Sequence, residues 1–195
     1  MTAVLQHLPF EGYDSKPWKN GRGITHDIAL IPPNAGHDNF DLRFALSPII
    51  EDGVFSSFPG IERVITLIEG AGLALEFADR QERLEPGASL QFDSALTPFG
   101  RPQGGPVKVI NVMARRGLWQ IARCTVITDG QDYRCAADGM FFVFCIDEGW
   151  RIETGAEAVT PARYDSVLVR GSTPVKLQHQ GGGQAIVAEI SAQPG

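Results

Sequence analysis

The segment Val64-Ile65-Thr66-Leu67-Ile68-Glu69-Gly70 recurs further along the chain as Phe142-Val143-Phe144-Cys145-Ile146-Asp147-Glu148-Gly149. Both segments are apolar runs that close on Glu-Gly, and the two Glu-Gly pairs lie 79 positions apart. Two further strand-like segments repeat at nearly the same spacing, 88–92 at 165–169 and 109–113 at 186–190. Three pairings at nearly one offset indicate two copies of one structural unit.

The rest of the chain has the pattern of short strands. Apolar or alternating runs recur about every ten residues between turns rich in Gly and Pro, and no window shows a helical apolar stripe. Each copy has a hairpin that ends in Glu-Gly and then a strand entered after a proline, Pro86 or Pro161. This arrangement resembles the cupins, so we predict an all-β bicupin with two tandem jelly-roll-like β-barrels. We expect an N-terminal lobe at 1–116, which holds the ligand pocket, and a C-terminal lobe at 117–195. The second lobe is expected to pack against the first as one compact unit.

Composition excludes several classes of protein. The net charge is −6, and residues 1–117 carry 11 basic and 14 acidic side chains, against 6 and 9 in residues 118–195. Neither part has the basic surface expected for nucleic-acid binding. Three cysteines without CxxC spacing predict reduced core residues in a cytoplasmic protein, and we expect no leader and no membrane span.

The histidines do not have the spacing of a cupin metal site. Such sites use a His-x-His pair, a Glu and a further His, whereas this chain has only His7, His26, His37 and His179, none of them adjacent. We expect His26 in a strand wall, His7 and His37 in solvent, and His179 at a polar strand end. No serine or cysteine has the context of a nucleophile. The sequence therefore predicts no metal, no cofactor and no catalytic residue.

Cationic and amide side chains remain as candidates for ligand binding. Arg63 begins the first hairpin strand, where its guanidinium would enter a barrel and bind a carboxylate through two hydrogen bonds. The alternative is a surface arginine paired with Glu62 or Glu51. Asn111 is a polar residue in an otherwise apolar strand, and Arg43 lies on the strand face opposite Phe40, Leu42, Phe44 and Leu46.

The run Pro17-Trp18-Lys19-Asn20-Gly21-Arg22-Gly23 places an aromatic, a cation and an amide together before two glycines. We predict a tight turn that brings Trp18, Lys19 and Asn20 to the rim of the pocket. The alternative is that Asn-Gly forms a turn without any ligand.

Four motifs in the N-terminal lobe resemble the HutD/Ves family. They are Pro17–Thr25, Arg43–Ser47, the run from Asp52 through Phe55 to Arg63, and Asn111–Arg116, and they occur in the family's order. The resemblance carries over to Trp18, Lys19, Asn20, Gly21, Thr25, Arg63 and Asn111. Arg43 and Phe55, within two of the motifs, complete the predicted ligand-binding set. Arg22 stands where the family usually has glycine, which would narrow the entrance or alter ligand choice.

The resemblance implies a bicupin without metal ligands that acts in bacterial histidine utilisation. It implies a non-catalytic, regulatory protein whose ligand is a small carboxylate such as urocanate or a formyl- or formimino-glutamate. One alternative is a metal-independent isomerase or hydrolase that acts on a similar acid through Glu51, Glu62, Asp27 or His26. Another is an interaction module, as in the stress-related Ves branch, with its barrel filled by its own side chains. A homodimer is compatible with each of these three functions.

Overall fold

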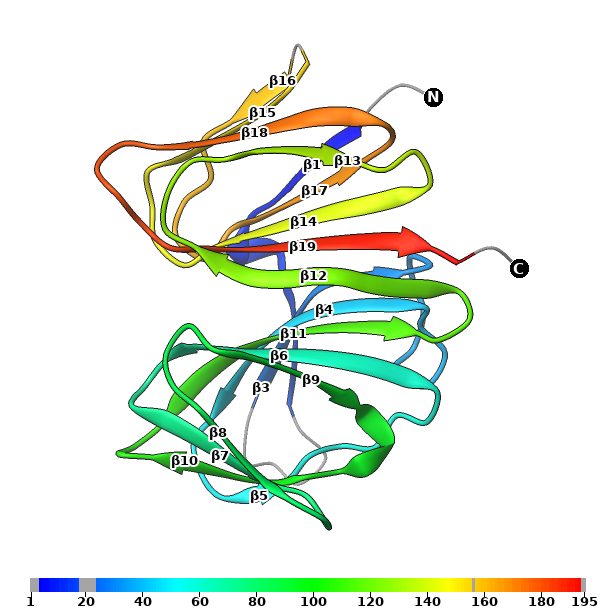
Figure 1. The fold of residues 1–195 in the computed structure, drawn as a ribbon, viewed down its shortest axis with the longest axis vertical. Helices are drawn as coiled ribbons and strands as arrows, with labels where there is room; N and C mark the ends of the chain where they lie inside the picture. The colour runs from blue at the N-terminus through cyan, green and yellow to red at the C-terminus, as the bar shows by residue number, and fades with distance from the viewer. Residues whose placement is uncertain (1–3, 18–23, 156, 194–195) are drawn as a thin grey trace. The chain divides into compact units, whose positions relative to one another are not determined.

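The structure is a computed structural model, and it describes residues 4–17, 24–155 and 157–193. Within these residues every regular element is a strand, apart from two short 3-10 turns, η1 (Phe10–Gly12) and η2 (Ser94–Leu96) (Figure 1). The prediction of an all-β fold is therefore confirmed. The chain divides into two compact units, which are Asp14–Leu118 and the combination of Met1–Tyr13 with Trp119–Gly195.

The unit Asp14–Leu118, the N-terminal unit below, consists of a six-stranded and a four-stranded sheet. The larger sheet has the order β2-β3-β4-β11-β6-β9 and the smaller has β5-β10-β7-β8, with antiparallel pairing throughout. Its strands are β2 (Asp14–Pro17), β3 (Ile24–Ile31), β4 (Leu42–Ile49), β5 (Gly53–Val54), β6 (Ile61–Glu69), β7 (Gly72–Glu76), β8 (Gln81–Leu84), β9 (Ser89–Asp93), β10 (Phe99–Gln103) and β11 (Val107–Arg115).

The C-terminal unit consists of a five-stranded and a four-stranded antiparallel sheet. Their orders are β1-β17-β14-β19-β12 and β13-β18-β15-β16. The strands are β1 (Val4–Leu8), β12 (Trp119–Ile127), β13 (Asp132–Cys135), β14 (Gly139–Cys145), β15 (Trp150–Thr154), β16 (Glu157–Val159), β17 (Ser166–Arg170), β18 (Thr173–His179) and β19 (Ala185–Ala192).

The two units repeat one topology. The order β4-β11-β6-β9 corresponds to β12-β19-β14-β17, and β5-β10-β7-β8 corresponds to β13-β18-β15-β16. The three segments paired in the sequence fall on matching strands, which confirms the internal repeat. The sheets differ only at their edges, because β2 and β3 extend one and β1 extends the other among the described residues. The description of each unit as a closed cupin barrel stays a prediction.

The Glu-Gly signature of the repeat has a steric cause. Gly70 and Gly149 have φ of 106° and 94°, which side-chained residues rarely adopt. A Cβ on Gly70 would lie 2.5 Å from Val107 Cγ1, and one on Gly149 would lie 3.0 Å from His179 Nε2. Each hairpin therefore needs glycine for its backbone angle and for the closeness of the neighbouring strand.

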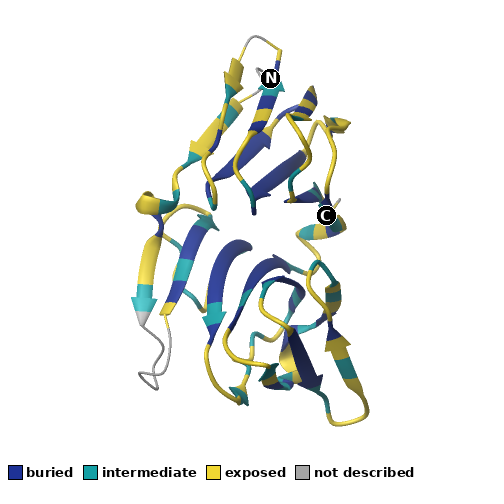
Figure 2. Ribbon diagram, turned by 90° about the vertical axis from the view of Figure 1, so that its left-hand side faces the viewer, coloured by how far each residue is buried: buried dark blue, intermediate teal, exposed yellow. Residues whose placement is uncertain are grey.

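The core of each unit lies between its two sheets, where the buried stretches of the strands gather (Figure 2). In the N-terminal unit, Ile65 and Leu67 of β6 pack with Leu73 and Leu75 of β7. In the C-terminal unit, Phe141, Val143, Trp150 and Ile152 belong to the corresponding cluster. Fully burying a side chain of this size stabilises a fold by roughly 1.5–3 kcal/mol, so these clusters hold the sheets of each unit together.

The first 13 residues belong to the C-terminal unit, whereas the sequence assigned 1–116 to one lobe. β1 pairs with β17 as an edge strand. The carboxylate of Asp165 accepts hydrogen bonds from the Phe10 backbone N–H at 2.8 Å and binds His7 Nε2 at 2.8 Å. The hydroxyl of Tyr13 donates to the Tyr164 carbonyl at 2.7 Å, and burial raises the pKa of Tyr13 above its usual value. These contacts hold the N-terminal segment, and His7, expected in solvent, is exposed but also contacts Asp165.

Candidate functional site

Strands β4, β11 and β6 place two arginines in one row on the same face of the six-stranded sheet. Arg43 lies opposite Met113, and Met113 lies opposite Arg63. Because side chains alternate along a strand, Arg63 shares its face with Ile65 and Leu67, which pack into the core between the sheets. Both guanidinium groups therefore lie inside the N-terminal unit rather than on its surface.

Arg63 is buried, with 5% of the residue exposed. Its Nη2 donates to the Ser56 carbonyl at 3.2 Å, while its Nε has no hydrogen-bond partner in the part of the chain that the structure describes. Three aromatic rings surround the guanidinium, with centroids 5.5–5.7 Å from its Cζ, and they belong to Phe55, Phe58 and Phe92. No carboxylate of the described residues pairs with it. The alternative of a surface ion pair with Glu62 or Glu51 is thus contradicted within those residues.

Burial, and to a lesser extent the nearby charge of Arg43, lower the pKa of Arg63 to about 9. The side chain still carries its proton at neutral pH. A buried charge without a counter-charge is costly, and an anion beside it would remove much of that cost. The electrostatics of the N-terminal unit therefore favour a negatively charged ligand at this position.

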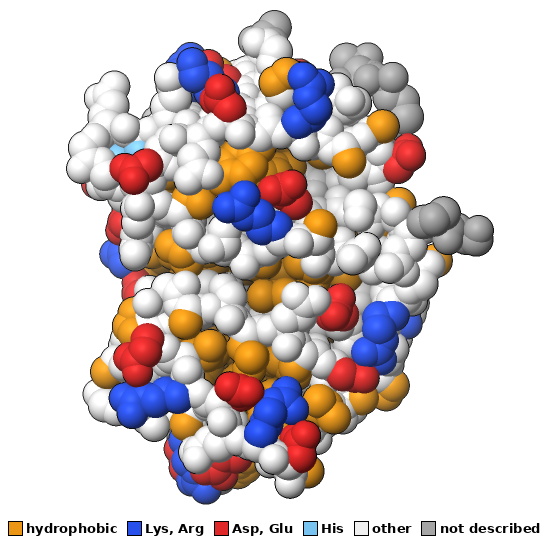
Figure 3. Space-filling view, in the orientation of Figure 1, with side chains coloured by type: hydrophobic (Ala, Val, Ile, Leu, Met, Phe, Trp, Pro, Cys, Tyr) orange, Lys and Arg blue, Asp and Glu red, His pale blue; other side chains and the backbone are white. Residues whose placement is uncertain are grey.

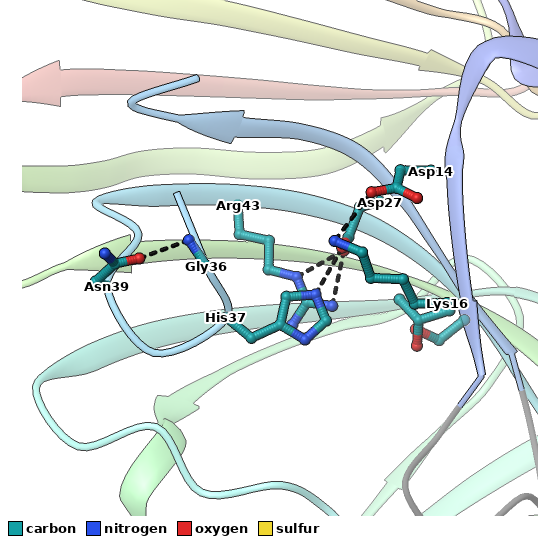
Figure 4. Close-up of polar contacts among 9 residues, drawn as sticks. Asp14, Lys16, Asp27, Gly36, His37, Asn39 and Arg43 are labelled. Atoms are coloured by element: carbon teal, nitrogen blue, oxygen red, sulfur yellow. Dashed lines mark hydrogen bonds and ion pairs between the residues drawn. The ribbon is translucent and has the colours of Figure 1, made fainter. Parts of the chain in front are cut away.

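Arg43 differs from Arg63 because it has a carboxylate partner. Its Nε and Nη2 both lie 2.7 Å from Asp27 Oδ1, and His37 Nε2 lies 2.7 Å from Asp27 Oδ2 (Figure 4). Lys16 Nζ approaches the same carboxylate at 3.8 Å. Asp27 is almost fully buried on β3, so this cluster joins β3, β4 and the loop before β4.

Three neutral polar groups lie next to the arginine row. Ser47 Oγ is 3.3 Å from Thr25 Oγ1 and accepts a long hydrogen bond of 3.5 Å from Asn111 Nδ2. All three residues are buried, and Asn111 Oδ1 has no partner among the described residues. Both Asn111 Oδ1 and Arg63 Nε are therefore buried polar atoms without a partner among the described residues.

The predicted site residues have different outcomes. The structure brings Arg63, Arg43, Phe55, Thr25 and Asn111 into the interior of one unit. Trp18, Lys19 and Asn20 lie outside the described residues, as does Arg22.

Sequence reasoning missed Ser47, Phe58 and Phe92. It expected His37 in solvent, and the side chain is 36% exposed but also contacts Asp27. Strand alternation could have identified Ser47 and Asp27. Ser47 lies four positions after Arg43 and Asp27 lies two after Thr25, so each shares a strand face with a residue already selected. No sequence signal links the loop residue His37 to Asp27. His26, expected in a strand wall, is half-buried and lies 2.8 Å from Ser15 Oγ through its Nδ1.

A cavity of about 170 Å³ lies in the N-terminal unit, and neither Arg43 nor Arg63 lines it. Phe58 forms part of its wall, and the same ring lies against the guanidinium groups of Arg63 and Arg43, at 5.5 and 5.9 Å. The residues that line the cavity are His37, Asp38, Phe40, Ser57, Phe58, Pro59, Ile61 and Arg115. Phe58 is therefore the lining residue that also contacts the buried cations.

Other chemistries find less support in the described residues. They contain no group of three or more His, Cys, Asp and Glu side chains that could hold a metal, and no helix long and apolar enough to cross a membrane. Burial raises the pKa of Cys135 and raises that of Cys145 to about 12, which makes both poor nucleophiles. Cys124 is only half-buried, in contrast to the core position expected for it. On the face shown in Figure 3, acidic and basic side chains lie beside one another.

Comparison with known proteins identifies a family model and a relative that match this chain. The HutD family model matches residues 11–187. An uncharacterized 21.2 kDa protein from the region 3′ of hutC in Pseudomonas putida is 33% identical over 110 residues, which is 56% of this chain and 57% of the relative. The chain thus spans less than two thirds of that relative's length.

Two solved structures are similar over almost the whole chain. The structure of HutD from Pseudomonas fluorescens SBW25, determined in a formate condition, has a TM-score of 0.82 at 25% identity and covers 98% of this chain and 100% of its own. A conserved protein of unknown function from Pseudomonas aeruginosa PAO1 has a TM-score of 0.89 at 22% identity, covering 96% and 99%. The latter supports the fold alone.

Proposed function

Because the chain belongs to the HutD family, we propose that it is a non-catalytic protein that binds a small carboxylate and thereby regulates histidine utilisation. The family and the hutC neighbourhood of the Pseudomonas putida relative supply the link to this pathway. The carboxylate ligand is inferred from the interior of the N-terminal unit, and the regulatory role from the family.

The environment of Arg63 carries the proposal. Its guanidinium is charged, buried and enclosed by three phenylalanine rings, and its Nε is unpaired among the described residues. A structural arginine would be expected to have a carboxylate partner, as Arg43 has in Asp27. A carboxylate ligand would complete the pairing through charge-assisted hydrogen bonds, which planar guanidinium groups form in pairs.

Polar groups around Arg63 support a ligand with more than a carboxylate. The unpaired end of the Asn111 amide and the Ser47 hydroxyl lie on the same strand faces. Acids of histidine breakdown, such as urocanate and formyl- or formimino-glutamate, combine a carboxylate with nitrogen-containing groups that can form hydrogen bonds with an amide and a hydroxyl. They are therefore the candidate ligands.

Isothermal titration calorimetry with urocanate, N-formylglutamate and formiminoglutamate tests the proposal. Arg63→Met should weaken binding of the true ligand by about tenfold or more, since a hydrogen-bonded charge contributes roughly 1.5–3 kcal/mol. Arg101→Met is the matched control, because Arg101 is an exposed arginine of the same unit, paired with Glu76. No binding of any of these acids at millimolar concentration, or equal binding by Arg63→Met, would overturn the proposal.

The regulatory part is tested in a host that degrades histidine. Replacing the chromosomal gene by the Arg63→Met variant should change urocanate accumulation after a histidine pulse in the same direction as deleting the gene. If urocanate accumulates in the variant strain as it does in wild type, ligand binding does not act on the pathway and the regulatory role is rejected.

A further inference from the structure

The two copies of the repeated topology differ at one sheet edge. In the C-terminal unit β17 lies between β14 and β1, whereas its counterpart β9 pairs only with β6 among the described residues. Ser166 and Val167 of β17 pair with β1 and are completely buried. At the offset of 77 the matching residues are Ser89, which is exposed, and Leu90, which is half-buried. β9 thus has an open edge where its copy holds a further strand.

The edge of β9 lacks the features that usually keep sheet edges apart. Such features are charged side chains, proline, irregular register and short length. Charged side chains occur in β2, β8, β13 and β16, and β2 also ends in proline; β5 has two residues, and β12 has an arginine and a register shift.

The one charged side chain of β9 is compensated. It belongs to Asp93, the last residue of the strand. Its Oδ1 accepts a hydrogen bond of 2.9 Å from the Ala95 backbone N–H, and its Oδ2 lies 2.9 Å from Arg116 Nη1. The open edge therefore carries no uncompensated charge of its own that would oppose pairing with another strand.

The sequence of β9 is complementary to itself in antiparallel pairing. A two-fold axis at Gln91 places Leu90 opposite Phe92 of the second copy and Ser89 opposite Asp93. Leu90 and Phe92 both pack against the core cluster, so their pair would extend the apolar face of the sheet. The other pair joins a hydroxyl and a carboxylate, and no two like charges face each other.

We propose that β9 is an interaction surface for a second copy of this chain, whose β9 pairs with it antiparallel about Gln91. The backbone groups of the two edges form hydrogen bonds across the axis, and the two six-stranded sheets continue as one. Both copies use the same surface, so the assembly closes at two chains. The inference concerns an outer edge of the N-terminal unit and does not depend on ligand binding.

β1 is the other edge strand without Lys, Arg, Asp or Glu. The repeat offers no counterpart for a strand beyond β1, because β9 itself ends its sheet. A two-fold axis at Gln6 would also place Leu5 opposite His7, whose ring is held by Asp165 at 2.8 Å. Gln6 and Gln91 are both exposed glutamines at the centre of five-residue edge strands, so Gln6 provides the matched control.

Sedimentation equilibrium over a range of protein concentrations tests the inference. The wild-type chain should reach twice its mass of 21.2 kDa. Gln91→Lys places two lysines opposite each other at the axis and should raise the dissociation constant by about tenfold or more. Gln6→Lys should leave it unchanged, and circular dichroism should show both variants folded. A wild-type protein that stays monomeric at millimolar concentration leaves the edge to a different chain and overturns the inference, as does a dimer that only Gln6→Lys dissociates.

Disulfide trapping tests the register without a charge change. Directly opposed residues have Cα atoms about 4.5–5.5 Å apart, within the range of a disulfide. In a Cys124→Ser background, which removes the cysteine that is not buried, Gln91→Cys should form a covalent dimer on mild oxidation. Ser89→Cys on the same strand face should form several-fold less, because the two Ser89 positions lie about 13 Å apart along the strands. Equal trapping at both positions, or none at Gln91→Cys, would reject this pairing.

Discussion

Arg43 and Arg63 lie in one row across the six-stranded sheet, one strand to either side of Met113, and of the two only Arg43 has a carboxylate partner among the described residues. The pair shows two ways of placing a cation inside a β-unit. Arg43 is paired with Asp27, whereas no carboxylate of the described residues compensates the charge of Arg63.

The unpaired charge predicts that Arg63→Met stabilises the ligand-free protein at pH 7. Replacing a buried charge by an apolar side chain of similar length should raise the free energy of unfolding by about 1–3 kcal/mol. The pKa of Arg63 is lowered to about 9 in the folded state, so the unfolded chain binds more protons above that pH and wild-type stability recovers.

Urea denaturation at pH 7 and pH 10 checks this expectation. The stability difference between variant and wild type should be largest at pH 7 and smaller at pH 10. Arg101→Met should show little change at either pH. A variant clearly less stable than wild type at pH 7 would mean that contacts with Phe55, Phe58 and Phe92 outweigh the cost of burying the charge.

Asp27→Asn should have the opposite effect on stability. It removes the counter-charge of Arg43 and the partner of His37, so we expect a loss of about 3–5 kcal/mol, as for a broken buried ion pair. Asp52→Asn, which removes an exposed partner of Arg101, should leave the urea midpoint nearly unchanged. Similar midpoints for the two variants would show that the Asp27 cluster contributes no more than a surface pair.

Phe58→Leu should accelerate ligand association. The Phe58 ring lines the cavity and lies against both guanidinium groups, so a smaller, flexible side chain there should ease access from the cavity to Arg63. Stopped-flow measurements with an acid that binds should show a higher association rate constant, by about threefold or more on the usual scale of such changes. Phe99→Leu, at a ring that lies against exposed Arg101, is the control. Equal association rate constants for wild type and Phe58→Leu would show that the ligand reaches Arg63 by another path.

Thiol reactivity should distinguish the three cysteines. Burial raises the pKa of Cys145 to about 12 and raises that of Cys135, so few thiolates form at these positions at pH 8. We expect Ellman's reagent to label Cys124 within minutes in the native protein and all three cysteines in 6 M guanidinium chloride. Rapid native labelling of a Cys124→Ser variant would contradict the burial of the other two.

Much of the fold could be predicted because its signals are local and repeated. The apolar run before Glu69-Gly70 and its copy before Gly149 give the hairpins, and alternation gives the face of Arg43 and Asn111. The assignment of the first 13 residues was missed because Asp165, which binds His7 and Phe10, is more than 150 positions away. His37 was missed for a related reason, since its contact with Asp27 depends on a loop turn closed by Asn39.

The position of Arg63 also could not be decided from sequence. An arginine next to Glu62 on a strand has the same local pattern whether it points into the unit or away from it. The register with Met113 and the shared face with Ile65 decide between the two, and both depend on how β6 and β11 pair.

The repeated topology makes the two copies unequal in their tolerance to mutation. At the offset of 78 that aligns Val64 with Phe142, the counterpart of Arg63 is Phe141, a core residue that is 1% exposed. A polar side chain there would disrupt packing, whereas an apolar side chain at 63 would remove a charge together with its hydrogen bond to Ser56. At this position one copy of the duplicated architecture thus has an apolar core residue and the other has a buried cation.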